Sequence, residues 1–232
     1  MVRAIFYLIA GVLFLPEVFA QVTPQEDMKD RVLLKLAPLS FFDIDNTVQA
    51  GLEIPLSDNR FTIHQEFGYG HAVFNPWYID WGDKPDKWIF RSRSQFRFYF
   101  HEWGTGRMYV AGEYLRKMVT NNQRIWAGVN CGGNNADCEY FEFRNVQRRK
   151  IVNALHAKVG WHFYFPRRIT LDLYVGAGLR MKNYKSSPDN VGNFNERRWF
   201  DEILFISDGL YPSVATGFQL GIPLNWRINK QP

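Results

Sequence analysis

The sequence predicts an all-β fold, an eight-stranded antiparallel up-and-down β-barrel of the transmembrane type. Three observations predict it: apolar and polar residues alternate with period 2, eight segments do so, and their connections are alternately short and long. The chain has 232 residues, 17% aromatics and a mean hydropathy of −0.30, so its many apolar residues are mixed with polar ones. We expect one barrel domain over 31–226, after a segment at 21–30 and before a tail at 227–232.

The first twenty residues have the features of a secretory signal peptide. Arg3 provides the positive start, Ile5–Leu15 forms the apolar core, and Val18-Phe19-Ala20 fits a cleavage site. The apolar core has 11 residues, which is too short to cross about 30 Å of hydrocarbon as a helix. We therefore expect cleavage after Ala20 and export from the cytoplasm.

Four alternating segments lie in the first half of the chain. Val32–Leu39 has a lysine between two leucines, and Thr47–Leu56 alternates over its whole length. The turn sequence Ser57-Asp58-Asn59 connects it to Phe61–Gly70, where Phe, Ile and Tyr alternate with Thr, His, Glu and Gly. In Trp88–Phe100, phenylalanines on one face alternate with arginines on the other. Each is expected to be a strand with one apolar face.

Four more alternating segments follow in the second half of the chain. Arg107–Lys117 is the weakest, and Ile151–Phe165 opposes aliphatic and aromatic residues to Lys, His and Gly. Ile169–Lys182 is the clearest, because every odd-numbered residue is apolar and the even-numbered ones include Thr, Asp, Gly, Arg and Lys. Leu210–Leu224 completes the set. A helix would scatter these residues around its axis, so the period indicates strands.

The connections differ in length on the two sides of the predicted barrel. Short turns are expected near 57–59, 101–106 and 166–168, and long loops at 71–87, 118–147 and 183–209. The first connection, near 42–46, is short but belongs to the long-loop side. Short periplasmic turns and longer external loops are typical of outer-membrane barrels.

A soluble eight-stranded barrel is the structural alternative, because alternation does not say which face points inward. A periplasmic lipocalin-like carrier would direct its apolar face toward a ligand. Glycines and charges of both signs on the polar face favour a narrow lumen instead. Aromatic residues near the strand ends, such as Trp88 and Trp161, favour membrane interfaces.

Two stretches carry a family resemblance. The run from Asp45 to Leu56, continued by Phe61-Thr62-Ile63 and Gly68-Tyr69-Gly70, resembles the opening hairpin of a domain-of-unknown-function family of small Gram-negative outer-membrane barrels. The run from Gly217 to Trp226 resembles the final strands of such barrels, and the layout is similar to outer-membrane protein A-type domains. The resemblance implies this fold and an outer-membrane location, and it implies no activity. Six residues follow Trp226, whereas many such barrels end on the terminal aromatic.

The polar faces of the strands predict a charged lumen. Because an eight-stranded barrel has room for little besides side chains, we expect a network of paired charges to fill it, rather than a small-solute pore. Cations outnumber acids among the inward residues, so some are expected near the mouths. The expected network comprises Glu53, Glu66, Arg91, Arg93, Arg97, Glu113, Lys158, Asp172 and Arg180.

The predicted external loops are rich in aromatic residues. Such side chains on a rigid scaffold suit recognition of a surface ligand or partner, so an adhesion-like or structural role is the leading hypothesis. An alternative is that these residues cap the barrel or enter the lipopolysaccharide layer. The recognition candidates are Trp77, Tyr78, Trp81, Trp126, Tyr140 and Trp199.

Other functions receive less support. A lipid-active enzyme could use His71 with Asp80 or Asp83, but no sequence motif marks a nucleophile, and we predict no catalytic residue, cofactor or metal site. The net charge of +5 is spread along the chain, which favours contact with outer-membrane lipids and lipopolysaccharide over nucleic acid.

Cys131 and Cys138 are the two cysteines, in a Gly- and Asn-rich segment. In an exported protein this spacing favours a disulfide that closes a small loop. A metal pair and a redox pair are the alternatives, and the CxxxxxxC spacing without a nearby histidine disfavours both.

Overall fold

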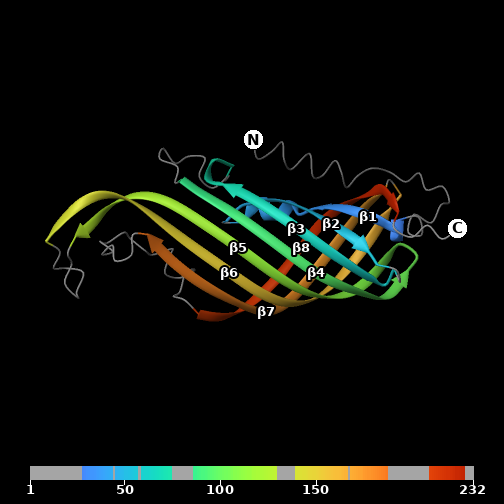
Figure 1. Cartoon of the computed structure of the whole chain (residues 1–232). Coiled ribbons are helices and arrows are strands. Elements are labelled where there is room, and N and C mark those ends of the chain that lie inside the picture. Colours follow the sequence, from blue (N-terminus) through green and yellow to red (C-terminus); the bar gives the residue numbers. More distant parts are fainter. Residues whose placement is uncertain are drawn as a thin grey trace, which may run out of the picture.

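Eight antiparallel strands form a closed barrel in the computed structural model (Figure 1), in which each strand pairs with the next and β8 pairs with β1. The structure describes residues 28–43, 45–56, 59–74, 86–129, 139–166, 168–187 and 209–227. The elements are β1 (Arg31–Leu36), η1 (Pro38–Phe42), β2 (Val48–Pro55), β3 (Phe61–His71), η2 (Ala72–Phe74), β4 (Asp86–Trp103), β5 (Gly106–Val129), β6 (Tyr140–Phe165), β7 (Ile169–Ser187) and β8 (Gly209–Arg227).

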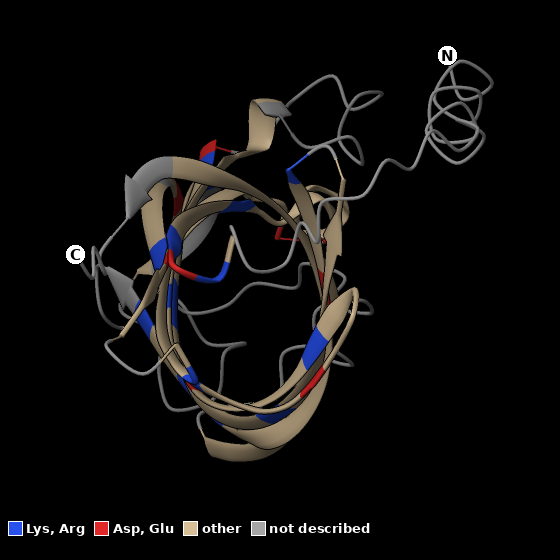
Figure 2. Cartoon of the chain, turned by 90° about the vertical axis from the view of Figure 1, so that its right-hand side faces the viewer, with Lys and Arg blue, Asp and Glu red and all other residues tan. Residues whose placement is uncertain are grey.

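The short turns lie at the end of the barrel where β1 begins and β8 ends (Figure 1). Arg31 pairs with Arg227 there, and Gly104 and Thr105 make the turn between β4 and β5. Figure 2 looks along the barrel from this end and shows the strands as a ring. Within the described part of the chain, no helix has the length and apolar character needed to cross a membrane.

Alternation along the strands separates an apolar outer face from a polar inner face. β2 alternates between exposed and buried residues over its whole length, with Val48 63% exposed and Glu53 2% exposed. On β7, Leu179 is 51% exposed, whereas Asp172 is fully buried. The large apolar side chains that are exposed come from every strand of the barrel. This arrangement is the reverse of a lipocalin-like carrier, whose apolar face would point inward.

The first expected strand is shorter in the structure. Residues 32–39 were expected to be extended, but β1 ends at Leu36 and η1 begins at Pro38. Proline has no N–H to donate to a strand partner and its φ angle suits the first residue of a helix. The chain therefore leaves the strand after Leu36 and forms η1. In η1, Ser40 Oγ lies within hydrogen-bond distance of the backbone oxygens of Ala37 and Thr47, at 2.6 and 2.7 Å.

The prediction of a long loop at 118–147 is wrong over most of that range. β5 continues to Val129 and β6 begins at Tyr140, so Trp126 and Tyr140 lie in strands, with Trp126 paired to Phe143. Beyond Asn122 and Gln147 the two strands pair only with each other among the described residues, so the alternation of a barrel wall is not required there. Polar cross-strand contacts accompany the pairing instead: Gln147 Nε2 donates to Asn122 Oδ1 at 3.0 Å, and Arg124 Nε donates to Asn145 Oδ1 at 3.2 Å.

The barrel wall has unequal height. β1 and β2 have 6 and 8 residues, whereas β5 and β6 have 24 and 26. The connection from η1 to β2 therefore lies against the tall wall of β4, β5 and β6, where Asp45 contacts a lysine from each of these strands. This geometry defines two halves of the lumen: a lower half near the short turns and an upper half above η1.

Candidate functional site

The lower half of the lumen contains a tier of two cations and two carboxylates that are all buried. Lys35 Nζ lies 2.7 Å from Asp172 Oδ2 and also pairs with Glu53. Arg97 Nη1 lies 3.0 Å from Glu53 Oε2 and 2.5 Å from Asp172 Oδ2. None of the four is more than 2% exposed. The strands bring them together from β1, β2, β4 and β7, because each occupies an inward position of its strand.

Aromatic hydroxyls supply further hydrogen bonds to this tier. Tyr99 Oη donates to Glu53 Oε1 and Tyr109 Oη donates to Asp172 Oδ1, both at 2.6 Å. The guanidinium of Arg97 lies over the Tyr109 ring, 4.6 Å from its centroid. Charges removed from water cost free energy unless they are paired and fully hydrogen-bonded. This tier meets that condition and fills the lumen with side chains.

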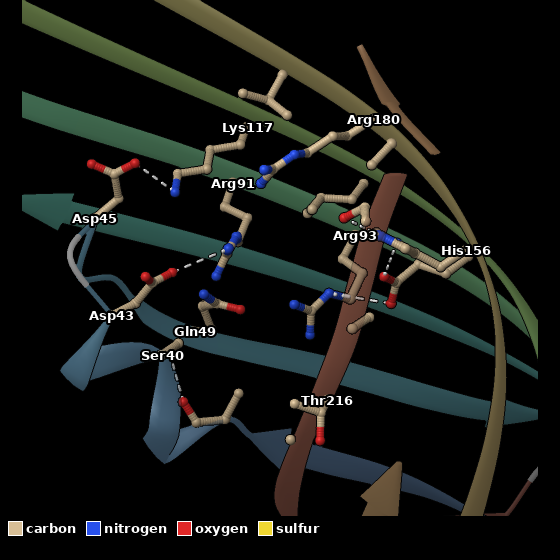
Figure 3. A pocket seen from close by; sticks show the side chains of 18 of the residues that line it. Ser40, Asp43, Asp45, Gln49, Arg91, Arg93, Lys117, His156, Arg180 and Thr216 are labelled. Atoms are coloured by element: carbon tan, nitrogen blue, oxygen red, sulfur yellow. Dashed lines mark hydrogen bonds and ion pairs between the residues drawn. The ribbon is translucent and has the colours of Figure 1, made fainter. Parts of the chain in front are cut away.

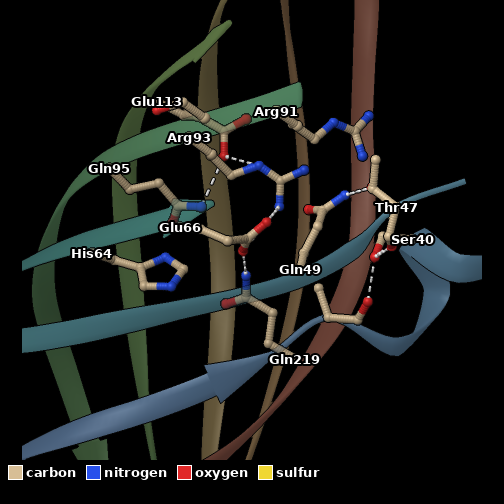
Figure 4. A network of polar contacts seen from close by, with 12 residues as sticks. Ser40, Thr47, Gln49, His64, Glu66, Arg91, Arg93, Gln95, Glu113 and Gln219 are labelled. Atoms are coloured by element: carbon tan, nitrogen blue, oxygen red, sulfur yellow. Dashed lines mark hydrogen bonds and ion pairs between the residues drawn. The ribbon is translucent and has the colours of Figure 1, made fainter. Parts of the chain in front are cut away.

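A second tier of buried cations and carboxylates includes Arg93, Glu66 and Glu113 (Figure 4). Arg93 Nη1 is 3.2 Å from Glu66 Oε1, and Arg93 Nε is 3.3 Å from Glu113 Oε2. Glu113 also pairs with Lys158 and lies 3.1 Å from His156 Nδ1. Gln95 joins the tiers, because its Nε2 donates to Glu113 at 2.8 Å and its Oε1 accepts from Arg97 Nε at 2.9 Å.

The upper half has a different charge balance, which begins with Asp45. Its carboxylate lies 2.6 Å from Lys87 Nζ, 2.7 Å from Lys117 Nζ and 3.4 Å from Lys150 Nζ. Burial alone would raise the pKa of the Asp45 carboxyl, but the charges of Lys117, Lys150 and Lys87 outweigh it and hold this pKa well below its usual range. One carboxylate thus compensates three lysines from three strands.

A cavity of about 440 Å³ opens above the second tier (Figure 3). Arg93, Glu113 and His156 contribute to its lining from the second tier, and η1 and β8 contribute from other sides. Six Lys or Arg side chains line it against three carboxylates. We regard this cavity as the candidate functional site, because it combines space with an excess of positive charge.

The expected network residues are distributed over these layers. Arg91 and Arg180 line the cavity, and Arg91 Nη2 lies 3.5 Å from Asp43 Oδ2. The others belong to the two tiers: Glu53, Arg97 and Asp172 to the lower one, and Glu66, Arg93, Glu113 and Lys158 to the second.

Sequence reasoning missed Asp43 and Asp45, which were assigned to a connection and not to the lumen. The spacing Asp-x-Asp just before a strand with a polar inner face was the available signal. It could not show that this connection folds against β4–β6, because that depends on the unequal strand lengths.

The β5–β6 hairpin extends beyond the rest of the barrel (Figure 1). β4 pairs with β5 only as far as Asn122, and β7 pairs with β6 only as far as Gln147, so 123–129 and 140–146 have no third strand beside them among the described residues. Tyr140, Phe141 and Phe143 are 50%, 39% and 56% exposed on this ribbon. Phe141 and Phe143 were not among the expected recognition residues, although their i, i+2 spacing places them on one face.

Several expected residues lie outside the described part of the chain, so the corresponding hypotheses stay predictions. They are the signal peptide at 1–20, the Cys131–Cys138 disulfide, and the loop residues Trp77, Tyr78, Trp81 and Trp199.

No protein-family model matches the sequence, and no curated protein matches it significantly. A major outer membrane protein from Thermus thermophilus has a similar solved structure, with 8% sequence identity and a TM-score of 0.39. The likeness covers 83% of this chain and 97% of that one. At this level it assigns neither a family nor an activity, and the resemblance to the domain-of-unknown-function family stays a prediction.

Proposed function

We propose that the chain is an outer-membrane β-barrel protein that spans the bilayer with a side-chain-filled lumen and serves a structural or surface-recognition role. The observation that carries this proposal is the inversion of the usual burial pattern. Arg97, Asp172 and Lys35 are at most 1% exposed, whereas Val214 and Leu155 are 77% and 65% exposed. A barrel in water would lose stability with this arrangement, whereas a barrel in lipid gains it.

The height of the apolar outer face supports the same proposal. On β7 the exposed apolar positions run from Ile169 to Met181, which are 42% and 44% exposed. At about 3.3 Å per residue and a strand tilt of about 45°, this run spans roughly 28 Å along the barrel axis. The hydrocarbon core of a bilayer is about 30 Å thick, so the apolar face matches it.

The filled lumen supports a structural role over conduction. Two tiers of buried ion pairs cross the barrel below the cavity, and the side chains of Arg97, Asp172 and His64 are completely buried there. Each ion in transit would need to break contacts in both tiers. We expect the purified protein to give no steady conductance in planar bilayers, and regular single-channel steps would contradict the filled-lumen proposal.

The exposed ribbon supports the recognition part. Two-stranded ribbons are marginally stable in water, and exposed aromatic side chains often mark interaction sites. We expect a Phe141→Ser, Phe143→Ser double variant to lose binding on a glycan array while keeping its barrel. The control is Phe90→Ser, an outward residue of β4 within the barrel. Equal array binding by the wild type and the double variant would argue against recognition by this ribbon.

Membrane insertion is tested by cell fractionation together with gel mobility before and after boiling. A closed membrane barrel resists SDS in the cold and migrates faster than its unfolded form. We expect this shift and recovery in the outer-membrane fraction. A freely soluble protein without a mobility shift would overturn the proposal.

A further inference from the structure

The cavity in the upper half lies at a lateral break in the barrel wall. β1 ends at Leu36, which pairs with Leu220, so within the described part of the chain residues 212–219 of β8 have a strand partner only on the β7 side. The other edge faces η1 across the cavity and has no strand partner among the described residues. Residues 213–218 of β8 line the cavity from both faces of the strand, as expected for an edge beside an opening.

The outside of this opening is apolar. Leu210 and Val214 are 64% and 77% exposed on the outer face of β8, and Val214 also lines the cavity. Unpaired backbone groups are tolerated at membrane depth only where they are buried or line a polar cavity. An edge with no strand partner in the described part of the chain, beside a cavity and next to an apolar outer face, is where a lipid could reach the lumen from the bilayer.

The inside of the opening is cationic. Arg91, Lys117 and Arg180 point into the same space (Figure 3), and Lys150 and Lys182 also line it. The carboxylates that meet these cations from the first connection are Asp43 and Asp45.

Arg180 distinguishes this group of cations. It has no carboxylate partner among the described residues, and its buried Nε has no hydrogen-bond partner there. A guanidinium with a buried donor and no counter-charge is costly, and a phosphate is an anion that its planar donors bind well. The structure thus leaves a donor directed into a cavity that can hold its acceptor.

We propose that this cavity binds the phosphate headgroup of a membrane lipid, which enters laterally between η1 and β8. The inference rests on the proposed membrane insertion. Arg180, Arg91 and Lys117 contact the phosphate, and an acyl chain stays outside, along Val214 on the outer face of β8. A volume of about 440 Å³ accommodates a headgroup, because small-molecule sites occupy about 300–1,000 Å³.

The test uses the full-length protein in maltoside micelles, which carry no phosphate. Phosphatidylglycerol is titrated in and the bound lipid is counted by native mass spectrometry, with and without inorganic phosphate as a competitor. We expect one tightly retained lipid per barrel and no displacement by millimolar inorganic phosphate. Displacement would identify a site for free anions and would overturn the lipid assignment.

The matched variants are Arg180→Met and Lys185→Met. Both remove one cation from β7, but Arg180 lines the cavity and Lys185 is exposed beyond it. We expect Arg180→Met to weaken lipid retention at least tenfold and Lys185→Met to leave it unchanged. Equal retention by both variants, or no retained lipid in the wild type, would overturn the site.

Gel mobility on the same samples separates the two proposals. A folded, heat-modifiable barrel that retains no lipid removes the lipid site and leaves the proposed function standing. A protein that shows no mobility shift and remains soluble without detergent removes both.

Discussion

In the lower half of the lumen the cations Lys35 and Arg97 face the carboxylates Glu53 and Asp172, whereas in the upper half cations outnumber carboxylates around a cavity of about 440 Å³. The lower half gains rigidity from buried carboxylates and cations that pair with one another and with tyrosine hydroxyls. The upper half has space, and the side chains of Lys87, Lys117 and Lys150 there are 12–13% exposed. The same residue types therefore fill the lumen in the lower half and line a cavity in the upper half.

The comparison predicts its largest effect at Arg97. Replacing Arg97 with Met leaves Glu53 and Asp172 with one remaining cation, and breaking a buried ion pair costs about 3–5 kcal/mol. We expect this loss in the free energy of unfolding, measured with urea in phospholipid vesicles by tryptophan fluorescence. Arg180→Met is the upper-half control, and we expect it to change stability by less than about 1 kcal/mol. Similar losses in both variants would remove the distinction between the two halves.

Packing in the lower half predicts the next effect. Gly160 lies opposite Tyr109 in the sheet, and a Cβ on Gly160 would come within 2.2 Å of the Tyr109 ring. Tyr109 is fully buried and donates to Asp172, so the ring has little freedom to move. We expect Gly160→Ala to lower the free energy of unfolding by about 2–3 kcal/mol. Gly112→Ala is the control because nothing lies within 4 Å of its added Cβ, and an equal loss there would contradict the packing argument.

The upper half predicts a pH-dependent effect at Asp45. Its folded pKa is depressed, so its contribution to stability is complete above its unfolded pKa of about 3.9 and is lost as the pH falls toward the folded value. We expect Asp45→Asn to cost about 1–2 kcal/mol at pH 7. The difference between wild type and variant should shrink below about pH 4. A difference that stays constant from pH 7 to pH 3 would show that the charge pairing with Lys87, Lys117 and Lys150 contributes nothing.

The sequence predicts the inner and outer faces well and the charge partners poorly. Period 2 in Ile169–Lys182 reports two different environments, so the inward positions of Asp172 and Arg180 follow from the sequence alone. Which carboxylate meets which cation depends on register and barrel curvature, and these involve residues far apart in the chain. Arg97 and Asp172 are 75 residues apart, for example.

Period 2 also fails where both faces of a strand share one environment. Residues 123–129 and 140–146 pair with each other beyond the barrel wall, so their sequence resembles that of a loop. The position of Asp45 was missed for another reason, since it depends on the early end of β1 at Leu36 and on the height of the opposite wall. The cavity therefore could not be predicted from the strand pattern.

The smallest expected change in the free energy of unfolding concerns an exposed ion pair at the lower end of the barrel. Comparing it with a buried ion pair separates the contribution of burial from that of pairing. Lys29 Nζ lies 2.5 Å from Glu102 Oε2, with the two side chains 21% and 39% exposed, and Glu102 also meets Arg107 Nε at 3.0 Å. Solvent screens such a pair, so we expect Lys29→Met to change the free energy of unfolding by less than about 0.5 kcal/mol. Lys35→Met removes the same charge from a site that is 1% exposed, and we expect a loss of about 3 kcal/mol or more. Urea unfolding of both variants in the same vesicles measures the difference. If the two losses are equal, the lower tier stabilises the barrel through charge balance at that end, and burial of the pairs has no separate effect.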